Sequence, residues 1–310
     1  MRVVFLGTGD FSLEVLKAVD SSAHQVVAII TQPDKVNGRN GKINFSPVKL
    51  YALEKDIPLY QFNSISKEGV DVIKSLNADI MLTSAYGQIL SDEIIAICPK
   101  GIINTHASLL PKYRGSSPIQ MALLNGDEYI GTTIMKTVKE VDAGDVVLQR
   151  AIKLNGDENA EECFEMLSKL SATAAVEALD AIESGSAQSI AQDHSKATHC
   201  KKLCKEDGQI DFNKTATEIH NQVRAYYGFP SAYCTSPYGR LKVIKSAVAE
   251  SEVNGGEIGE VIEAKKERFV VRCGANTALA FLTVQGEGGK VMSVGAYTLG
   301  RPIKVGTILK

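Results

Sequence analysis

Short apolar segments alternate with helix-like segments through residues 1–150, and this alternation constrains the fold more than any other feature. Apolar, β-branched segments occur at residues 2–7 (RVVFLG), 25–32 (QVVAIITQ) and 78–87 (ADIMLTSAYG). The stretches between them carry Leu, Val and Ile at helical spacing. Strands separated by helices pair in parallel, and continuously apolar strands indicate a sheet that is covered on both faces. The pattern therefore predicts an α/β fold with a doubly wound, mostly parallel, Rossmann-like sheet.

The segments that follow complete the first predicted domain. Residues 131–138 (GTTIMKTV) and 144–154 (GDVVLQRAIKL) predict two further strands, and residues 159–185 predict a long helix rich in Ala and Leu. We expect the first domain, residues 1–185, to end with this helix. Residues 186–209 are polar and lack periodicity, which is typical of a linker.

The composition changes again in the last part of the chain, residues 210–310. This part opens with an amphipathic helix at residues 214–227 (KTATEIHNQVRAYY). Short apolar runs follow, each bounded by Gly, Asn or charged residues: SAYCTSPYG, RLKVIKSAVA, GEIGEVIEA, RFVVRCG and ALAFLTVQG. Short strands at such regular spacing predict a small barrel or sandwich. An oligonucleotide-binding-type β-barrel fits the size of this second domain.

Charge and cysteine content limit the class of protein. Lys and Arg number 34 and Asp and Glu number 36, so any contact with nucleic acid requires a local basic patch. No apolar stretch approaches the about 20 residues of a membrane span. The start of the chain, MRVVFLGTGDFS, resembles a first strand and not a secretion signal, and the six cysteines are scattered. We therefore expect a cytoplasmic protein with reduced thiols.

Two short motifs are weak indications of ligand binding. The sequence GTGDFS contains Gly7 and Gly9 at dinucleotide-binding spacing but lacks the third glycine, so a tight strand-to-helix turn is the alternative. The sequence HCKKLC brings together His199, Cys200 and Cys204. Two thiols and one imidazole leave a structural zinc site one ligand short. We therefore predict that the protein has no metal site.

Residues 33–47 (PDKVNGRNGKINFSP) form a long segment without apolar periodicity. Long loops inside compact domains are usually functional or disordered. This loop carries Lys35, Arg39 and Lys42 against a single acidic residue, Asp34. Basic side chains on a loop rich in Gly and Asn can contact phosphates, and a solvated loop without a ligand is the alternative.

The residues that point most directly to chemistry are Asn104, His106 and Asp142. Alternation places Asn104 and His106, in the segment GIINTH, on one face of a strand. Asp142 follows the next predicted strand, in the sequence VDAGD. A donating amide, a proton-accepting imidazole and a carboxylate that orients it suit the attack of an amine on a carbonyl. An α-amino group, with a pKa of about 7.7 to 8, needs no nucleophilic side chain to help it.

The stretch NTHASLLPKYRGSSPIQ, followed by GTTIM and VDAGDVV, resembles the signature of the 10-formyltetrahydrofolate-dependent formyltransferases. The Asn-x-His, Ser-Leu-Leu-Pro and Asp-x-Gly elements are all present. GTGDFS, TQPD with a basic loop ending in SPVK, and the C-terminal GRPIKVGTIL extend the resemblance over nearly the whole chain. They favour the branch of this family that acts on a charged tRNA. The resemblance implies transfer of the formyl group of 10-formyltetrahydrofolate to the α-amino group of methionyl initiator tRNA, for translation initiation.

The same resemblance implies roles for particular segments. It implies that the first domain carries the catalytic Asn104, His106 and Asp142. The barrel and the basic residues Lys35, Arg39 and Lys42 would hold tRNA. The residues implied to bind the folate are Ala85, Tyr86, Gly87, Ile89, Ser108, Leu109, Leu110 and Pro111. The sequence departs from the family pattern where Gly9 replaces a usual Pro and where Asn40 and Gly41 replace part of a more basic run.

Several alternatives stay open from the sequence alone. A sibling enzyme that formylates an amino sugar nucleotide would share Asn104, His106 and Asp142 but would not need the basic loop. A folate- or nucleotide-binding module without catalysis would have no use for these three residues. His106 can act as a base or as a cationic stabiliser, because a sequence does not determine its protonation state. We expect a monomer.

Overall fold

The computed structural model describes residues 1–37, 42–250 and 255–310 of the chain. The chain divides into two compact units, each built from more than one segment. The first unit comprises Met1–Pro118, Tyr129–Lys153 and Phe164–Cys200. The second unit comprises Ile119–Glu128, Leu154–Cys163 and Lys201–Lys310.

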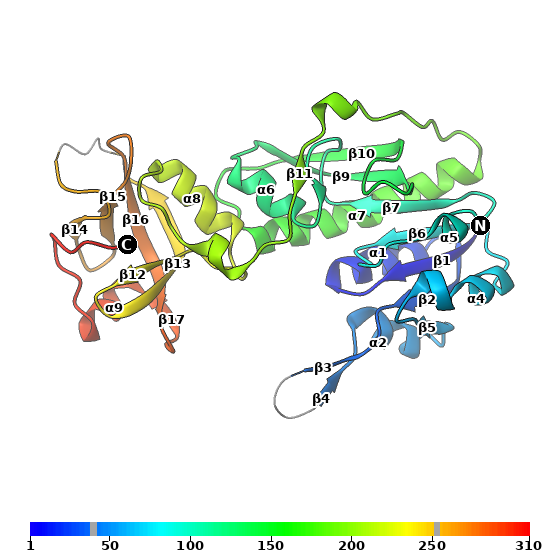
Figure 1. Ribbon diagram of the computed structural model, residues 1–310, viewed down its shortest axis with the longest axis horizontal. Coiled ribbons are helices and arrows are strands. Elements are labelled where there is room, and N and C mark those ends of the chain that lie inside the picture. Colours follow the sequence, from blue (N-terminus) through cyan, green and yellow to red (C-terminus); the bar gives the residue numbers. More distant parts are fainter. Residues whose placement is uncertain (38–41, 251–254) are drawn as a thin grey trace. The chain divides into compact units, whose positions relative to one another are not determined.

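In the described part of the first unit, a seven-stranded sheet has the strand order β10-β9-β7-β6-β1-β2-β5 (Figure 1). The five strands from β7 to β5 pair in parallel. β9 pairs antiparallel with β7, and β10 pairs antiparallel with β9. The strands are β1 (Arg2–Gly7), β2 (Gln25–Thr31), β5 (Leu59–Gln61), β6 (Ile80–Ser84), β7 (Ile102–His106), β9 (Tyr129–Lys136) and β10 (Val146–Lys153). This arrangement confirms the predicted mostly parallel, Rossmann-like sheet.

Helices connect and cover these strands. α2 begins where the Ser46 hydroxyl accepts a hydrogen bond from the Lys49 amide at 3.1 Å, with Pro47 in the first helical position. One core cluster joins β1, β2 and β6 to the helices α3 to α5 through residues such as Leu6, Ile73 and Ile94. The helices of this unit are α1 (Asp10–Asp20), α2 (Pro47–Glu54), α3 (Ile65–Glu68), α4 (Val70–Ser75), α5 (Asp92–Ile95) and most of α7 (Ala160–Glu183). Helix α6 (Pro118–Leu124) belongs to the second unit except for its first residue.

The described part of the second unit holds a six-stranded antiparallel sheet, ordered β12-β13-β16-β15-β14 with β17 beside β16. Helix α8 begins at a capping box formed by Thr215 and Glu218. Its residues Ile219 and Val223 pack into the core of this sheet. The elements are α8 (Ala216–Ala225), β12 (Tyr233–Ser236), β13 (Gly239–Val248), β14 (Val261–Ala264), β15 (Phe269–Arg272), β16 (Ala278–Gly286), β17 (Val291–Ser293) and α9 (Val294–Gly300). The predicted C-terminal β-domain of the oligonucleotide-binding type is confirmed.

Two segments have more structure than the sequence indicates. The basic loop contains a hairpin, in which β3 (Lys35–Asn37) pairs with β4 (Lys42–Asn44). The expected linker is hydrogen-bonded to the first unit, because Ile190 and Val146 exchange two backbone hydrogen bonds. Further along, β11 (His199–Cys200) pairs with β8 (Arg114–Gly115), and short 3-10 turns occupy His194–Lys196 and Lys205–Gly208. Within the described residues, no helix has the length and apolar character to span a membrane.

Candidate active site

Hydroxyl and amide groups line the carboxyl ends of the neighbouring parallel strands β6 and β7. Strands β6 and β7 pair so that Thr83 lies beside Asn104 and Ser84 beside Thr105. The Thr105 hydroxyl donates to the Ser84 hydroxyl at 2.8 Å, and the Thr83 hydroxyl donates to Asn104 Oδ1 at 2.7 Å. Because its oxygen accepts this bond, the Asn104 side chain has an amide NH₂ that can donate to a ligand.

His106 ends β7 and is buried. Its Nε2 lies 2.8 Å from the carbonyl oxygen of Tyr113. A carbonyl can only accept a hydrogen bond, so Nε2 carries the hydrogen and Nδ1 is the acceptor nitrogen of the neutral ring. His106 Nδ1 faces the carboxylate of Asp142, with 3.6 Å between Nδ1 and Oδ2. The structure therefore brings His106 and Asp142 together, as the sequence predicts.

Asp142 lies in the loop of residues 137–145 between β9 and β10, which we call the Asp142 loop. Its φ of 53° is left-handed, a conformation that a non-glycine residue keeps only when its surroundings hold it. The Gly115 amide donates to Asp142 Oδ2 at 2.8 Å. A Cβ at Gly144 would lie 1.8 Å from the Lys136 carbonyl oxygen, so only glycine allows this close approach. The close approach to Lys136 thus explains the glycine of the Asp-x-Gly element.

The Ser-Leu-Leu-Pro segment, residues 108–111, is an anchored turn. The Ser108 hydroxyl donates to the Lys112 carbonyl at 2.6 Å, and the Leu110 amide donates to the Thr133 hydroxyl at 3.2 Å. Leu110 is buried, and Leu109 and Pro111 are half-buried. Gln149 Nε2 donates to the Leu110 carbonyl at 2.7 Å. The turn follows directly after the strand that bears His106, and its polar groups serve largely to fix its own shape.

The segment after β6, predicted to bind a folate, combines exposed residues with one buried ring. Ala85 and Gly87 have positive φ and are exposed, and Ile89 is 82% exposed. The Tyr86 ring instead lies in the core, where burial raises the pKa of its hydroxyl to about 12. The Tyr86 carbonyl accepts a hydrogen bond from Gln32 Nε2 at 2.9 Å. Of the residues predicted here to bind the folate, Ala85, Gly87 and Ile89 are therefore exposed, whereas the Tyr86 ring is not.

The three basic residues predicted to meet phosphates are only partly described. Lys35 is exposed at the start of β3, Lys42 lies on β4, and Arg39 lies outside the described residues. The base of the hairpin is tied down by an ion pair between Lys49 and Asp34. The hydrogen bond from Lys49 lowers the pKa of the Asp34 carboxyl. Asp34 and Lys49 thus neutralise one another at the base of the hairpin.

The residues of the HCKKLC sequence do not form a metal-ligand cluster in the described chain. Cys200 Sγ lies 3.2 Å from the Arg114 carbonyl, and burial raises the pKa of this thiol. Cys204 Sγ instead lies 3.2 Å from Asp207 Oδ2. The glycine turn after β1 is also a packing feature, since a Cβ at Gly7 would lie 2.6 Å from the Cβ of Ser12.

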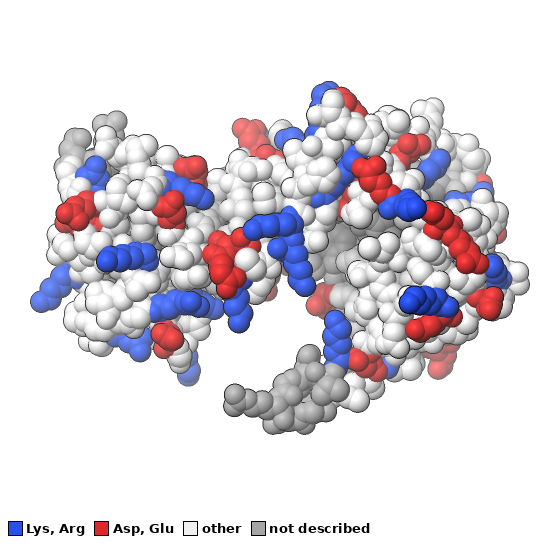
Figure 2. All heavy atoms as spheres, viewed as in Figure 1, with Lys and Arg blue, Asp and Glu red and all other residues white. Residues whose placement is uncertain are grey.

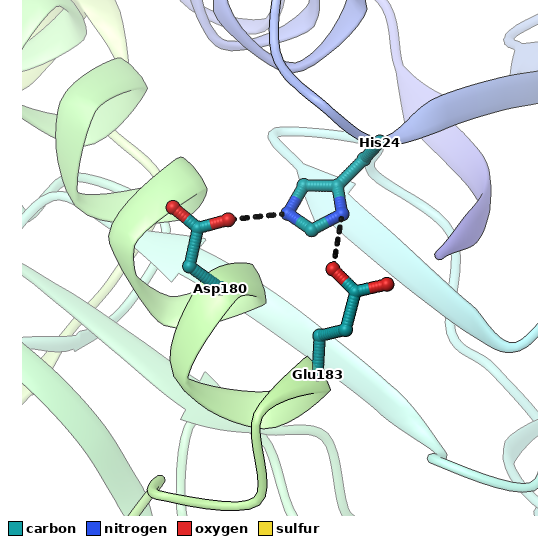
Figure 3. A group of neighbouring side chains, drawn as sticks. All are labelled: His24, Asp180 and Glu183. Atoms are coloured by element: carbon teal, nitrogen blue, oxygen red, sulfur yellow. Dashed lines mark ion pairs between the residues drawn. The ribbon is translucent and has the colours of Figure 1, made fainter.

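One group of possible metal ligands does occur among the described residues: His24, Asp180 and Glu183 (Figure 3). His24 Nε2 lies 3.1 Å from Asp180 Oδ1, and Nδ1 lies 3.5 Å from Glu183 Oε2. The amine of Met1 also pairs with Glu183, at 2.8 Å. Each ring nitrogen faces a different carboxylate, whereas a single ion would bind only one of the two nitrogens. The arrangement is an ion-pair network that ties the start of β2 to the end of α7.

We expect dialysis of the protein against a strong chelator to leave its melting temperature unchanged, because this network needs no ion. Adding Zn²⁺ afterwards should also have no effect, and the variant His24→Ala serves as the control. An ion that binds only the folded state adds about 2.7 kcal/mol at 100 times its dissociation constant. A rise in melting temperature with Zn²⁺ that is lost in His24→Ala would contradict the ion-pair interpretation.

The structure adds residues to the site that the sequence analysis missed. Arg114 and Gln192 are both buried, and Gln192 contacts the backbone of the Asp142 loop. Tyr113 supplies the carbonyl that orients His106. Gln192 lies in the polar stretch expected to be a linker, and such a stretch has no periodicity that singles out one residue. Arg114 stands eight residues after His106, and only its burial distinguishes it from a surface arginine.

Comparisons with known proteins agree with this fold. Residues 1–179 match the formyl transferase family, and residues 202–302 match the formyl transferase C-terminal domain. The chain is 41% identical over 309 residues to methionyl-tRNA formyltransferase of Sulfurihydrogenibium sp. (strain YO3AOP1), with 99% of each chain covered. It is 38% identical to methionyl-tRNA formyltransferase of Clostridioides difficile (strain 630), with 100% of each chain covered.

Solved structures show the same fold at lower identity. A sugar 3N-formyl transferase, WlaRD, determined with dTDP and 5-N-formyl-THF, superposes with a TM-score of 0.68 at 19% identity, covering 91% of this chain and 97% of that one. HypX from Aquifex aeolicus in complex with tetrahydrofolic acid gives a TM-score of 0.62 at 15% identity, covering 98% of this chain and 48% of that one. The fold and the two family matches together define a two-domain formyl transferase. The chain belongs to the methionyl-tRNA formyltransferase family.

Proposed function

We propose that the chain transfers the formyl group of 10-formyltetrahydrofolate to the α-amino group of methionyl initiator tRNA, a step of translation initiation. The observation that carries this proposal is the identity of 36 to 41% over 96 to 100% of the chain with relatives named methionyl-tRNA formyltransferase. The WlaRD structure, determined with 5-N-formyl-THF, supports a folate as the donor. The exposed Ile89 beside the open backbone at Gly87 fits a flat ring with polar edges.

In the proposed reaction, the amine of the methionyl ester attacks the formyl carbon, and the bond between that carbon and N10 of the folate breaks. The Asn104 amide donates to the oxyanion that forms on the formyl oxygen. His106 Nδ1 is the ring nitrogen free to take the ammonium proton, since Nε2 already donates to Tyr113. The Asp142 carboxylate, 3.6 Å away, stabilises the charge on the ring. The proton is then delivered to N10, which leaves as tetrahydrofolate.

The second candidate is formylation of an amino sugar nucleotide, the activity named for the structural neighbour WlaRD. That likeness is 19% identical and supports only a shared fold. We expect the conversion of 10-formyltetrahydrofolate to tetrahydrofolate to depend on methionyl initiator tRNA. The kcat/KM for this tRNA should be at least about 1,000-fold above the kcat/KM for a dTDP-linked amino sugar. The expected difference reflects a site whose polar groups stay unpaired with the wrong acceptor. A higher kcat/KM for the sugar nucleotide would overturn the proposal.

We assign donor binding and chemistry to residues 1–185 and tRNA binding to the basic loop and to residues 210–310. Figure 2 shows basic and acidic side chains interspersed over the face drawn, as expected from the net charge of -2. Phosphate contacts must then come from local groups. In the second unit, a hollow of about 250 Å³ includes Arg240, Lys242 and Glu287 in its lining. The Arg240 guanidinium also stacks on the Tyr233 ring at 4.3 Å. We propose a monomer acting in the cytoplasm, where charged initiator tRNA occurs.

Replacing Lys35, Arg39 and Lys42 together by Ala should raise KM for tRNA and leave KM for the folate unchanged. Each lost phosphate contact should reduce the slope of log affinity against log salt by about 0.7 to 0.9. Arg39→Ala should cost more than Lys35→Ala, because a planar guanidinium can make two directed hydrogen bonds to a phosphate. The measurement is KM for tRNA as a function of salt concentration.

The matched control for this experiment replaces Lys17, Lys67 and Lys74 by Ala. These lysines are exposed on helices of the first unit, so the control removes the same number of charges. Its salt slope should equal that of the unmodified protein. Equal slopes for both triple variants would show that the loop is a solvated connector without phosphate contacts.

A further inference from the structure

We infer that Gln192, oriented by the buried Arg114, is a positioning residue that holds the Asp142 loop in its reactive conformation. The inference rests on the proposed function, because it takes Asp142 as the carboxylate that faces His106. Gln192 belongs to the segment expected to be a linker, and it has no direct contact with His106 among the hydrogen bonds of the described residues. It acts through the backbone of the Asp142 loop.

The amide of Gln192 makes two hydrogen bonds to that loop. Its Nε2 donates to the Asp142 carbonyl at 2.9 Å and to the Gly144 carbonyl at 2.7 Å. The side chain is 7% exposed, so water does not compete freely for these carbonyls. Asp142 has the left-handed φ of 53°, and Gly144 packs against Lys136. The two bonds therefore clamp the part of the loop where the backbone is least free to relax.

Arg114 determines which way the amide points. Gln192 Oε1 accepts from Arg114 Nε at 3.2 Å and from Nη2 at 2.8 Å. A guanidinium only donates, so the amide oxygen must face it and the amide NH₂ must face the two carbonyls. Arg114 is 2% exposed, and it also pairs with the exposed carboxylate of Glu140 at 3.3 Å and contacts His194 Nδ1 at 3.2 Å. All donor and acceptor sites of the Gln192 amide are thus engaged.

Backbone groups at and near Arg114 and Gln192 are themselves hydrogen-bonded, so these two residues can hold the Asp142 loop in place. The residue after Arg114 is Gly115, whose amide donates to Asp142 Oδ2 at 2.8 Å. The Arg114 amide donates to the Thr198 carbonyl at 2.8 Å, and Ile190 is hydrogen-bonded to Val146. The Asp142 carboxylate is therefore held from the side of β8, and its backbone from the segment that carries Gln192. The hydrogen bonds to the carboxylate and those to the backbone together fix the position of Asp142 and its distance from His106.

The test compares Gln192→Glu and Gln192→Met with the unmodified protein. Glu keeps the size of Gln and its pairing with Arg114 but replaces both donors to the loop, and Met removes the donors without adding charge. We expect kcat to fall about 10- to 100-fold in both variants, because a misplacement of about 1 Å can cost about 100-fold. KM for folate and for tRNA should change by less than about 2-fold, since substrate contacts are not removed. Backbone amides of residues 137–145 should exchange hydrogen faster.

A double-mutant cycle with Asp142→Asn separates positioning from general destabilisation. If Gln192 acts through Asp142, adding Gln192→Glu to Asp142→Asn should lower kcat by no more than about 2-fold further. An equal loss in both backgrounds, or unchanged exchange in the loop, would overturn the inference. Full activity of Asp142→Asn alone would instead overturn the catalytic assignment, while hydrogen exchange still reports whether Gln192 holds the loop.

The matched control is Gln222→Glu in α8. Gln222 is 5% exposed, and its Nε2 also donates to two carbonyls, those of Asp207 at 3.2 Å and Gln209 at 2.9 Å. The same chemical change there should lower the melting temperature and leave the hydrogen exchange of residues 137–145 unchanged, because Gln222 has no hydrogen bond to the Asp142 loop. Equally fast exchange of residues 137–145 in Gln222→Glu would show that reduced stability alone explains the effect at Gln192, and would contradict the inference.

Discussion

Replacing Asp142 by Asn is expected to lower kcat for formyl transfer at least about 100-fold, the usual cost of losing an acid-base or charge-stabilising group. The variant keeps the side-chain size, and its amide oxygen can still accept from Gly115, so the loop should keep its shape. What it loses is the negative charge 3.6 Å from His106 Nδ1. His106→Ala and Asn104→Ala should have losses of similar size, with little change in folate affinity.

Steady-state kinetics at saturating folate and tRNA, together with the folate dissociation constant, measure this expectation. Asp71→Asn is a suitable control, because Asp71 is an exposed carboxylate in the first turn of α4. It should retain full turnover. Near-normal kcat in any one of the three site variants would remove that residue from the proposed mechanism.

The second large effect is expected from Gly144→Ala. The added methyl group would lie 1.8 Å from the Lys136 carbonyl oxygen and 2.8 Å from its carbonyl carbon, so the backbone must move. Overpacking of this kind costs about 1 to 3 kcal/mol of stability. Because the displaced residues include Asp142, we expect kcat to fall about 100-fold, with a smaller change in KM for the folate.

Gly300→Ala provides the comparison for this variant. Gly300 ends α9, and a Cβ there has no atom within 4 Å, so the change should leave stability and kcat as they are. Thermal unfolding and kcat are measured on both variants. If Gly144→Ala is as stable and as active as Gly300→Ala, the close approach at Gly144 does not constrain the Asp142 loop.

The parallel sheet was predictable because its strands are continuous apolar runs, and the segments between them carry apolar residues at helical spacing. β5 (Leu59–Gln61) was not predictable in this way, because it is three residues long and half-buried. The β3–β4 hairpin also escaped prediction, since its strands are short and polar apart from Val36 and Ile43, which pair with one another. In the second unit, β17 and α9 lack any apolar run long enough to mark them.

Asn104 and His106 were predictable as a pair because alternation along β7 requires them to share a face. Asp142 was singled out by the Asp-x-Gly pattern, and the close packing of Gly144 against Lys136 explains the glycine of that pattern. The contact of Arg114 with Gln192 joins residues 78 positions apart, and no local pattern in a polar stretch marks such a partner. The core position of the Tyr86 ring likewise depends on packing that only the folded chain shows.

The most direct test of the proposed function is transfer of a labelled formyl carbon from 10-formyltetrahydrofolate to methionyl initiator tRNA, with a dTDP-linked amino sugar present in the same reaction. A parallel reaction contains methionyl-tRNA whose amine has been acetylated beforehand. We predict label on the free-amine methionyl-tRNA, no label on the acetylated form, and loss of labelling in Asp142→Asn. Label on the sugar nucleotide, or equal label on blocked and free methionyl-tRNA, would contradict transfer to the α-amino group.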